Sequence, residues 1–154
     1  MKSFKDYIHK IREEPEPDPP VVKNCFDICK ADDSRMQVFG WASIAVTTDG
    51  EQIEDYQGDL IDPDDLEQAA YEFVRLYGDG GEMHEPSKRI VAKLIESAVF
   101  TKEKAKAMGI PEGTLPEGWW IGFQVTDQAV WGKVKDGTYS MFSIEGEGER
   151  VPVD

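Results

Sequence analysis

Stretches rich in β-branched and aromatic residues predict that strands form much of this chain. The first is Met36 to Thr47, in which Gly40 indicates a bulge or a close backbone approach, and Asp49-Gly50 ends the run as a turn. Four more strands are expected at Ile90–Phe100, Trp119–Thr126, Ala129–Val134 and Thr138–Gly146. The last three follow one another through short turns, which predicts consecutive antiparallel hairpins.

Apolar residues fall at helical spacing in three other segments. The clearest is Pro63 to Tyr77, which has Asp62 as its N-terminal cap and Gly78 as its stop. A short helix is expected at Thr101–Met108, and Ile110 to Gly118 reads as a proline- and glycine-rich loop that is a candidate lid. Met1 to Glu14 also has helical spacing but is too short to be stable alone, so it needs a partner surface or the domain itself.

The segment Glu13 to Pro20, EEPEPDPP, is acidic and proline-rich, and it predicts an extended linker. We therefore divide the chain into a short helix with its linker, residues 1–20, and one folded domain, residues 21–154. Several strands, one main helix and hairpin connections favour an α+β fold. The expected architecture is a small antiparallel β-barrel, closed or nearly closed, flanked by helices.

Charge and composition narrow the classes of partner. The chain has 31 acidic and 17 basic residues and a formal charge of −14, which argues against binding to nucleic acid or anionic lipid. No apolar run approaches the ~20 residues of a membrane span, and the N-terminus lacks the core of a signal peptide, so a cytosolic protein is expected. Cys25 and Cys29 do not form a zinc pattern with the two histidines, and we expect reduced, partly buried thiols and no cofactor or metal.

A serine, a histidine and a glutamate are the candidate chemical groups. Ser143 alternates onto the same face of its predicted strand as Tyr139 and Met141, where it is either a core hydroxyl or a nucleophile on a rigid strand. His84 lies in the glycine-rich connection Asp79 to Glu85. Glu96 shares a predicted strand face with Ile90, Ala92, Leu94 and Ala98, so it either faces water at the sheet edge or needs a partner.

The order histidine, carboxylate, glycine-rich hairpins and serine resembles that of the prohead maturation proteases of tailed phages. More closely, five short patterns in register resemble the XkdF-type phage serine proteases, which are related to the herpesvirus assemblins. The patterns are FGWAS at Phe39–Ser43, GDLIDPDDLEQAA at Gly58–Ala70, GEMH at Gly81–His84, IES at Ile95–Ser97 and FSIEG at Phe142–Gly146. The resemblance covers roughly Val38 to Gly148.

This resemblance implies a small β-barrel flanked by helices and an endopeptidase that acts on phage scaffold and major capsid proteins, and on itself, inside the immature head. The implied partners are those proteins and further copies of the chain, with no nucleic acid or membrane. The implied location is the prohead in the host cytoplasm, or the bacterial cytoplasm for a prophage-encoded protein. Two other classes stay open: an inactive capsid-associated protein with a protease fold, and a scaffold-like assembly factor.

Carried over onto this chain, the family's serine falls on Ser143 and its histidine on His84. Assemblin-like enzymes use a second histidine after the serine, and none follows Ser143 here. Glu96, the acidic residue of the IES pattern, is our choice as third catalytic residue, and Glu85 and Asp127 remain alternatives. The chain ends soon after Ser143, and a missing segment is expected to carry part of the oxyanion hole or of a dimer contact.

Overall fold

A computed structural model of the chain describes residues 27–54, 58–145 and 148–152. The predicted N-terminal helix Met1–Glu14, the linker Glu13–Pro20 and Cys25 lie outside the described residues. The described Cys29 is exposed, so the expectation of a partly buried thiol is wrong at this position.

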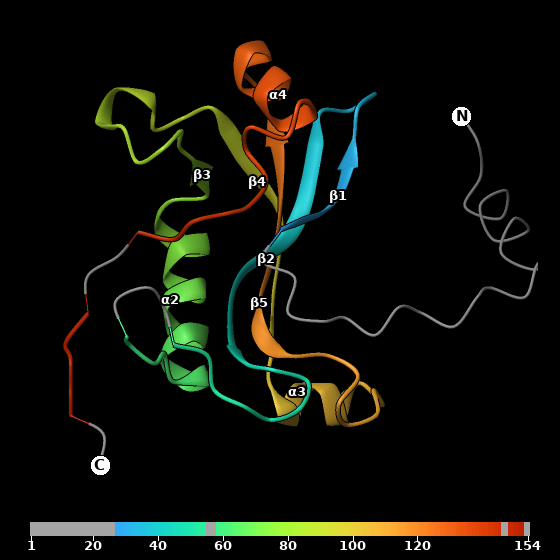
Figure 1. Cartoon of the computed structure of the whole chain (residues 1–154), viewed down its shortest axis with the longest axis vertical. Coiled ribbons are helices and arrows are strands. Elements are labelled where there is room, and N and C mark those ends of the chain that lie inside the picture. The colour runs from blue at the N-terminus through green and yellow to red at the C-terminus, as the bar shows by residue number, and fades with distance from the viewer. Residues whose placement is uncertain (1–26, 55–57, 146–147, 153–154) are drawn as a thin grey trace, which may run out of the picture.

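One antiparallel sheet organises the described chain (Figure 1). Its strands lie in the order β1-β2-β5-β4-β3, and neighbouring strands are antiparallel. The strands are β1 Ile28–Asp32, β2 Gln37–Val46, β3 Asp79–Gly80, β4 Ala92–Phe100 and β5 Glu117–Val125. The strands predicted at Met36–Thr47, Ile90–Phe100 and Trp119–Thr126 are therefore confirmed, and the last of these, β5, lies at the centre of the sheet.

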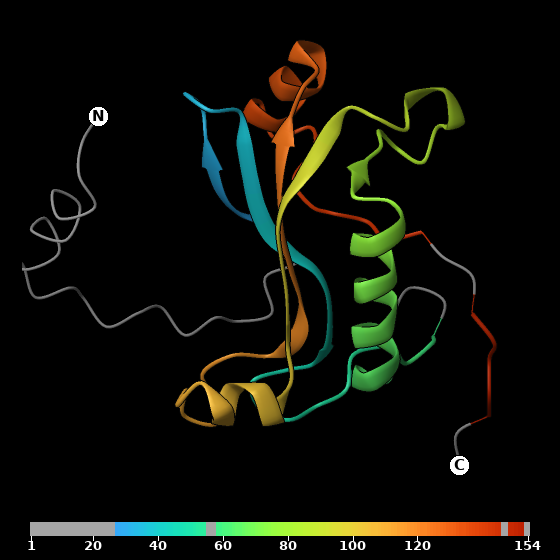
Figure 2. The ribbon, with the colours of Figure 1, turned by 180° about the vertical axis from the view of Figure 1, so that it is seen from behind.

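Helix α2, Pro63–Leu76, covers one face of this sheet (Figures 1 and 2). Asp62 caps it by accepting a hydrogen bond from the backbone N–H of Asp64, as the sequence predicts. On its inner side the Phe73 ring packs edge-on against the rings of Trp119 and Phe123 of β5. The core of the domain thus lies between α2 and the central strands. The short predicted helix is also present, as α3, Lys102–Ala107, with Thr101 as its cap.

The α+β class is confirmed, but the predicted closed barrel is wrong, because β1 and β3 form two separate edges of an open sheet. The two segments expected to supply the closing strands are built differently. Residues 128–135 form helix α4, Gln128–Lys135. The described residues of Thr138–Gly146 form no regular strand: Thr138 and Tyr139 lie in a bend and Met141 forms an isolated bridge. Without those hairpins, the described part of the chain supplies no further strands with which the sheet could close.

Helix α4 replaces the strand predicted at Ala129–Val134 because of its cap and its apolar spacing. The Asp127 carboxylate accepts hydrogen bonds from the backbone N–H groups of Ala129 and Val130, which starts a helix. Val130 and Trp131 are then buried on one side, and the Trp131 indole donates to Asp33 at 2.8 Å. A short apolar run of this kind fits either element, and the packing of Trp131 decides it.

The close backbone approach predicted at Gly40 is confirmed, whereas the bulge beside it has its extra residue, Cys29, in β1. The β1–β2 register shifts between Ile28 and Lys30, opposite Gly40. A Cβ at Gly40 would lie 3.1 Å from the backbone oxygen of Asp27 and 3.2 Å from the ring of Phe142. The absence of a side chain at Gly40 therefore makes space for the ring of Phe142, the residue before Ser143.

Candidate active site

His84 lies on a tight turn in the loop that joins β3 to β4. The backbone N–H of Glu85 donates to the carbonyl of Glu82 at 3.0 Å, which closes the turn. Its two central residues, Met83 and His84, have φ angles of 49° and 56°. Residues with side chains rarely adopt this left-handed backbone conformation, which costs of order 1–3 kcal/mol per residue. Other contacts must therefore hold the turn in place.

Contacts with three other parts of the domain hold the residues that directly precede Ser143. The backbone N–H of Tyr139 donates to the carbonyl of Lys133 in α4, and the N–H of Ile28 donates to the carbonyl of Ser140. Phe142 packs against the ring of Phe123 on the side of the sheet that α2 covers. Ser143 itself is exposed and not on a regular strand, so the expectation of a half-buried strand face is wrong. The anchoring comes from its neighbours.

The structure brings Ser143 and His84 together across 59 positions of sequence, with His84 Nε2 3.0 Å from Ser143 Oγ. The other ring nitrogen, Nδ1, lies 3.2 Å from Oε2 of Glu145. In the tautomer that carries its proton on Nδ1, next to this carboxylate, Nε2 presents a lone pair to the serine hydroxyl. This arrangement of hydroxyl, imidazole and carboxylate is the one that activates a serine as a nucleophile.

Glu145 is the residue that the sequence reasoning missed. It lies two positions after Ser143, and in an extended chain residues i and i+2 point to the same side. The alternation used for Ser143 therefore also contained the signal for Glu145. Its side chain is 72% exposed and that of His84 is 42% exposed, so water has access to this contact.

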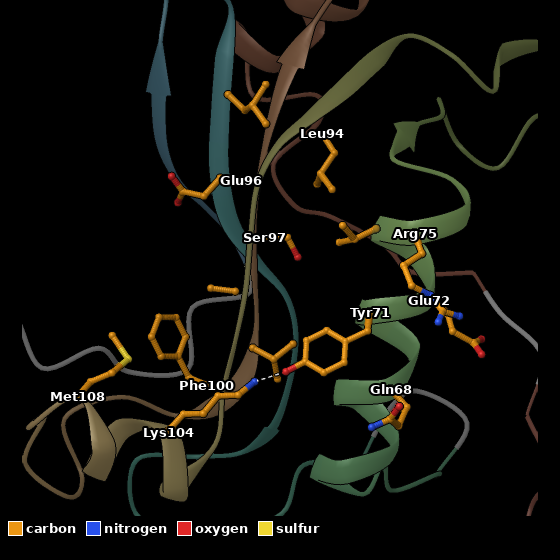
Figure 3. Close-up of a pocket in the computed structure, with 14 residues that line it drawn as sticks. Gln68, Tyr71, Glu72, Arg75, Leu94, Glu96, Ser97, Phe100, Lys104 and Met108 are labelled. Carbon is orange, nitrogen blue, oxygen red and sulfur yellow. Dashed lines mark hydrogen bonds between the residues drawn. The ribbon is translucent and has the colours of Figure 1, made fainter.

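The structure does not bring Glu96 to the histidine. The register of β4 against β5 shifts between Leu94 and Glu96, so these two residues do not share a face as predicted. In Figure 3, Leu94 and Ser97 point toward α2, whereas Glu96 points away from it. The Glu96 carboxylate accepts a hydrogen bond from the indole of Trp120 at 2.7 Å. Its partner is thus an indole on the other face of the sheet.

The two alternatives for the third residue also have other contacts. Glu85 precedes the 3-10 helix η2, Pro86–Lys88, and forms an ion pair with Lys88 at 3.5 Å. Asp127 caps α4. The groove between α2 and β4 in Figure 3 is lined by Glu96 and Ser97 but by neither Ser143 nor His84. The candidate site is therefore the exposed cluster of Ser143, His84 and Glu145.

The most strongly perturbed acid near this cluster is Glu82, at the first position of the histidine turn. Its side chain is 5% exposed and accepts hydrogen bonds from Lys133, Tyr139 and Lys88. These three donors lower the pKa of Glu82 from 4.5 to about 2. In return, Glu82 and Tyr139 raise the pKa of Lys133. Glu82 is therefore a carboxylate in the folded protein across the neutral range.

The described residues contain neither a metal-binding cluster nor a membrane-spanning helix. Within residues 27–54, 58–145 and 148–152, no group of three His, Cys, Asp or Glu side chains is suited to hold a metal ion. Across the same part of the chain, every helix falls short of the length and apolar character needed to cross a bilayer.

The chain matches a known protein family over most of its length. The model of the family described as "Putative phage serine protease XkdF" matches residues 26–152. The chain therefore belongs to the XkdF family of phage serine proteases, and this membership supports a role as a phage protease, which is a hydrolase. No curated protein and no solved structure matches the chain.

Proposed function

We propose that this protein is a serine endopeptidase of phage head maturation that cleaves scaffold and major capsid proteins, and also itself. The observation that carries the proposal is the 3.0 Å contact between His84 Nε2 and Ser143 Oγ, with Glu145 on the opposite ring nitrogen. Family membership supports the same class of reaction. Ser143 is the nucleophile, His84 the general acid–base, and Glu145 the carboxylate that orients His84.

In the first half of the reaction, Ser143 Oγ forms a bond to the scissile carbonyl carbon while His84 Nε2 takes the hydroxyl proton. The carbonyl π electrons move onto oxygen, giving a tetrahedral intermediate. As this collapses, the C–N bond breaks and His84 gives its proton to the leaving amine. Glu145 stabilises the imidazolium that exists between these two transfers, because its carboxylate faces Nδ1–H.

In the second half, water attacks the acyl-serine and His84 again carries the proton. Water gives a proton to Nε2 as its oxygen bonds to the acyl carbon, and that proton returns to Ser143 Oγ as the ester bond breaks. The exposure of Ser143 and His84 suits a polypeptide substrate that approaches from outside the domain.

The proposed substrates and place of action rest on the resemblance to the phage prohead proteases rather than on the geometry. Scaffold and capsid proteins are proposed as substrates, the prohead in the host cytoplasm as the place, and a homo-oligomer as the active form. The formal charge of −14 favours neutral or basic substrate segments, since acidic segments would be repelled.

The test is to incubate the full chain with its cognate scaffold and major capsid proteins, beside Ser143→Ala. A matched control is Ser140→Ala, because Ser140 is an exposed serine of the same segment. A fluorophosphonate probe, which reacts with activated serines, is applied to the same three proteins. We expect wild type and Ser140→Ala to cleave and to be labelled, and Ser143→Ala to do neither.

Cleavage that survives in Ser143→Ala would assign the reaction to another nucleophile. A wild-type protein that neither cleaves nor is labelled, yet enters assembling heads, would instead be the inactive capsid-associated protein. Head assembly that fails without the chain, with no cleavage, would select the scaffold-like factor.

A further inference from the structure

We propose that Glu82 is a positioning residue for catalysis, which holds the His84 turn against the Ser143 segment through Tyr139 and Lys133. This inference rests on the proposed function, because it assigns the residue that keeps nucleophile and base in register. Glu82 touches neither ring nitrogen of His84 and no hydroxyl of Ser143, so its effect passes through the two segments that carry them.

The donors to Glu82 come from three parts of the chain. Lys88 belongs to the same β3–β4 loop and donates at 2.9 Å. Lys133 belongs to α4, and its Nζ lies 2.5 Å from Oε1 of Glu82. Tyr139 begins the segment that leads to Ser143, and its hydroxyl donates to the same oxygen at 2.6 Å. One buried carboxylate thus joins the histidine turn to both elements that precede the serine.

These contacts act where the backbone needs support. Glu82 directly precedes Met83 and His84, which both have left-handed φ angles. Its own backbone closes the turn, since its carbonyl accepts from Glu85 and its N–H donates to Lys88 at 2.9 Å. Strained residues persist when many surrounding contacts hold them in place. The side chain of Glu82 supplies such contacts, because it binds Lys133 and Tyr139 outside the turn. Without it, the turn would still form but would lose its fixed distance to Ser143.

Lys133 and Tyr139 also contact each other directly. The backbone N–H of Tyr139 donates to the carbonyl of Lys133 at 3.0 Å, and the two side chains meet at 3.2 Å. Glu82 therefore binds two residues, Lys133 and Tyr139, that also contact each other. Ser143 lies only four residues after Tyr139 in the sequence. Displacement of a reacting group by about 1 Å costs about 10²-fold in rate, so loosening this joint should be visible in catalysis.

The chain contains a matched control for this arrangement. Glu67 of α2 also accepts from a tyrosine hydroxyl, that of Tyr71 at 2.7 Å, and forms an ion pair with Lys104. The pKa of Glu67 is likewise lowered, by Lys104 first and Tyr71 second. Glu67, Tyr71 and Lys104 thus repeat the combination of carboxylate, tyrosine and lysine found around Glu82. They lie between α2 and α3, on elements that contain neither His84 nor Ser143.

The experiment compares Glu82→Gln and Tyr139→Phe with Glu67→Gln and Tyr71→Phe in the full chain. The readouts are the rate of fluorophosphonate labelling of Ser143 and the kcat and KM for a cleaved substrate, measured where each variant is folded by circular dichroism. We expect labelling and kcat to fall about 10- to 100-fold in Glu82→Gln, with KM changed less than threefold, and by a smaller factor in Tyr139→Phe. Glu67→Gln and Tyr71→Phe should stay within twofold of wild type.

A second readout follows His84 directly. The chain has two histidines, so the His84 ring signals can be assigned by NMR with His84→Ala as reference. Glu82→Gln should shift the His84 ring signals toward those of a solvated imidazole, whereas Glu67→Gln should not. Glutamine keeps the shape of glutamate, so the change reports the lost charge.

The inference is overturned if Glu82→Gln is labelled at the wild-type rate with unchanged His84 signals. It is equally overturned if both glutamate variants lose labelling in proportion to their loss of thermal stability, because that is the mark of a purely structural role. If wild type itself is not labelled, the serine mechanism falls, and the His84 signals still decide whether Glu82 anchors the turn.

Discussion

Ser143 and Glu145 lie two positions apart on one extended segment and contact opposite nitrogens of the same histidine ring. The candidate site therefore has two parts rather than three. One part is the segment with serine and carboxylate, and the other is the turn that carries His84. Packing of the turn against this one segment therefore brings all three groups together.

Removal of the histidine should abolish the reaction without unfolding the domain. His84→Ala removes the group that takes the serine proton, and loss of a triad member costs about 10⁴-fold or more in kcat. The His84 side chain is exposed, so the thermal midpoint should stay near that of wild type. Cleavage assays and calorimetry on the same preparation check both expectations. A His84→Ala protein that keeps a tenth of wild-type activity would exclude His84 as the base.

The two glutamates that compete for the third role can be separated directly. Glu145→Gln should lower kcat about tenfold, because a carboxylate this exposed orients the imidazole less strongly than a buried one. Glu96→Gln should leave kcat unchanged, since the Glu96 carboxylate accepts a hydrogen bond from the indole of Trp120 and a glutamine oxygen can accept the same bond. Rates measured from pH 5 to 9 check this. The opposite order of effects would return the role to Glu96.

A methyl group at Gly40 should disturb the serine segment. The Cβ of Gly40→Ala would lie 3.2 Å from the Phe142 ring and 3.1 Å from the Asp27 oxygen, and such overpacking costs about 1–3 kcal/mol. Labelling of Ser143 should slow, because Phe142 must shift. The control is Gly132→Ala in α4, where a Cβ meets nothing within 4 Å and helix propensity should raise stability by about 0.5–1 kcal/mol. Urea denaturation gives both values.

Acid should remove the contribution of Glu82 to stability. Its folded pKa, about 2, lies below its ordinary value of 4.5, so the stabilisation is complete above about pH 5 and declines as the pH falls toward 2. The free energy of unfolding of wild type should therefore exceed that of Glu82→Gln at pH 7, and the difference should shrink between pH 5 and pH 2. Urea denaturation at pH 7, 5, 4 and 3 measures it. A difference independent of pH would mean that the charge of Glu82 does not carry its effect.

Asp32 provides a comparison for this experiment. Its pKa is also lowered to about 2, by the Ser34 hydroxyl first and by Arg35 second. Its partners Ser34 and Arg35 lie within three residues of it. The difference in unfolding free energy between wild type and Asp32→Asn should therefore depend on pH in a similar way, with no effect on labelling of Ser143.

Much of the framework follows from signals confined to a few neighbouring residues. Helix α2 is predictable because Asp62, Pro63 and Gly78 mark its start and end locally, and the strands β2, β4 and β5 because their β-branched and aromatic residues favour extended backbone. The order of the sequence patterns led to Ser143 and His84, which the structure places in contact.

The remaining features depend on partners that are distant in sequence. The bulge that turns Glu96 away from Leu94 depends on how β4 pairs with β5. This pairing cannot be predicted from the alternation of apolar and polar residues in β4 alone. The run at 129–134 suits a strand or a helix until Trp131 is buried and bonded to Asp33, and with that helix the barrel cannot close.

The sequence by itself determined the elements whose signals are local, together with the serine and the histidine as candidates. Only the tertiary structure decided that Glu145, and not Glu96, faces His84, and that Glu82 joins the histidine turn to Lys133 and Tyr139. The physical reason is that a carboxylate acquires its role from the donors that reach it. Those donors come from elements far apart in the chain, which only packing brings together.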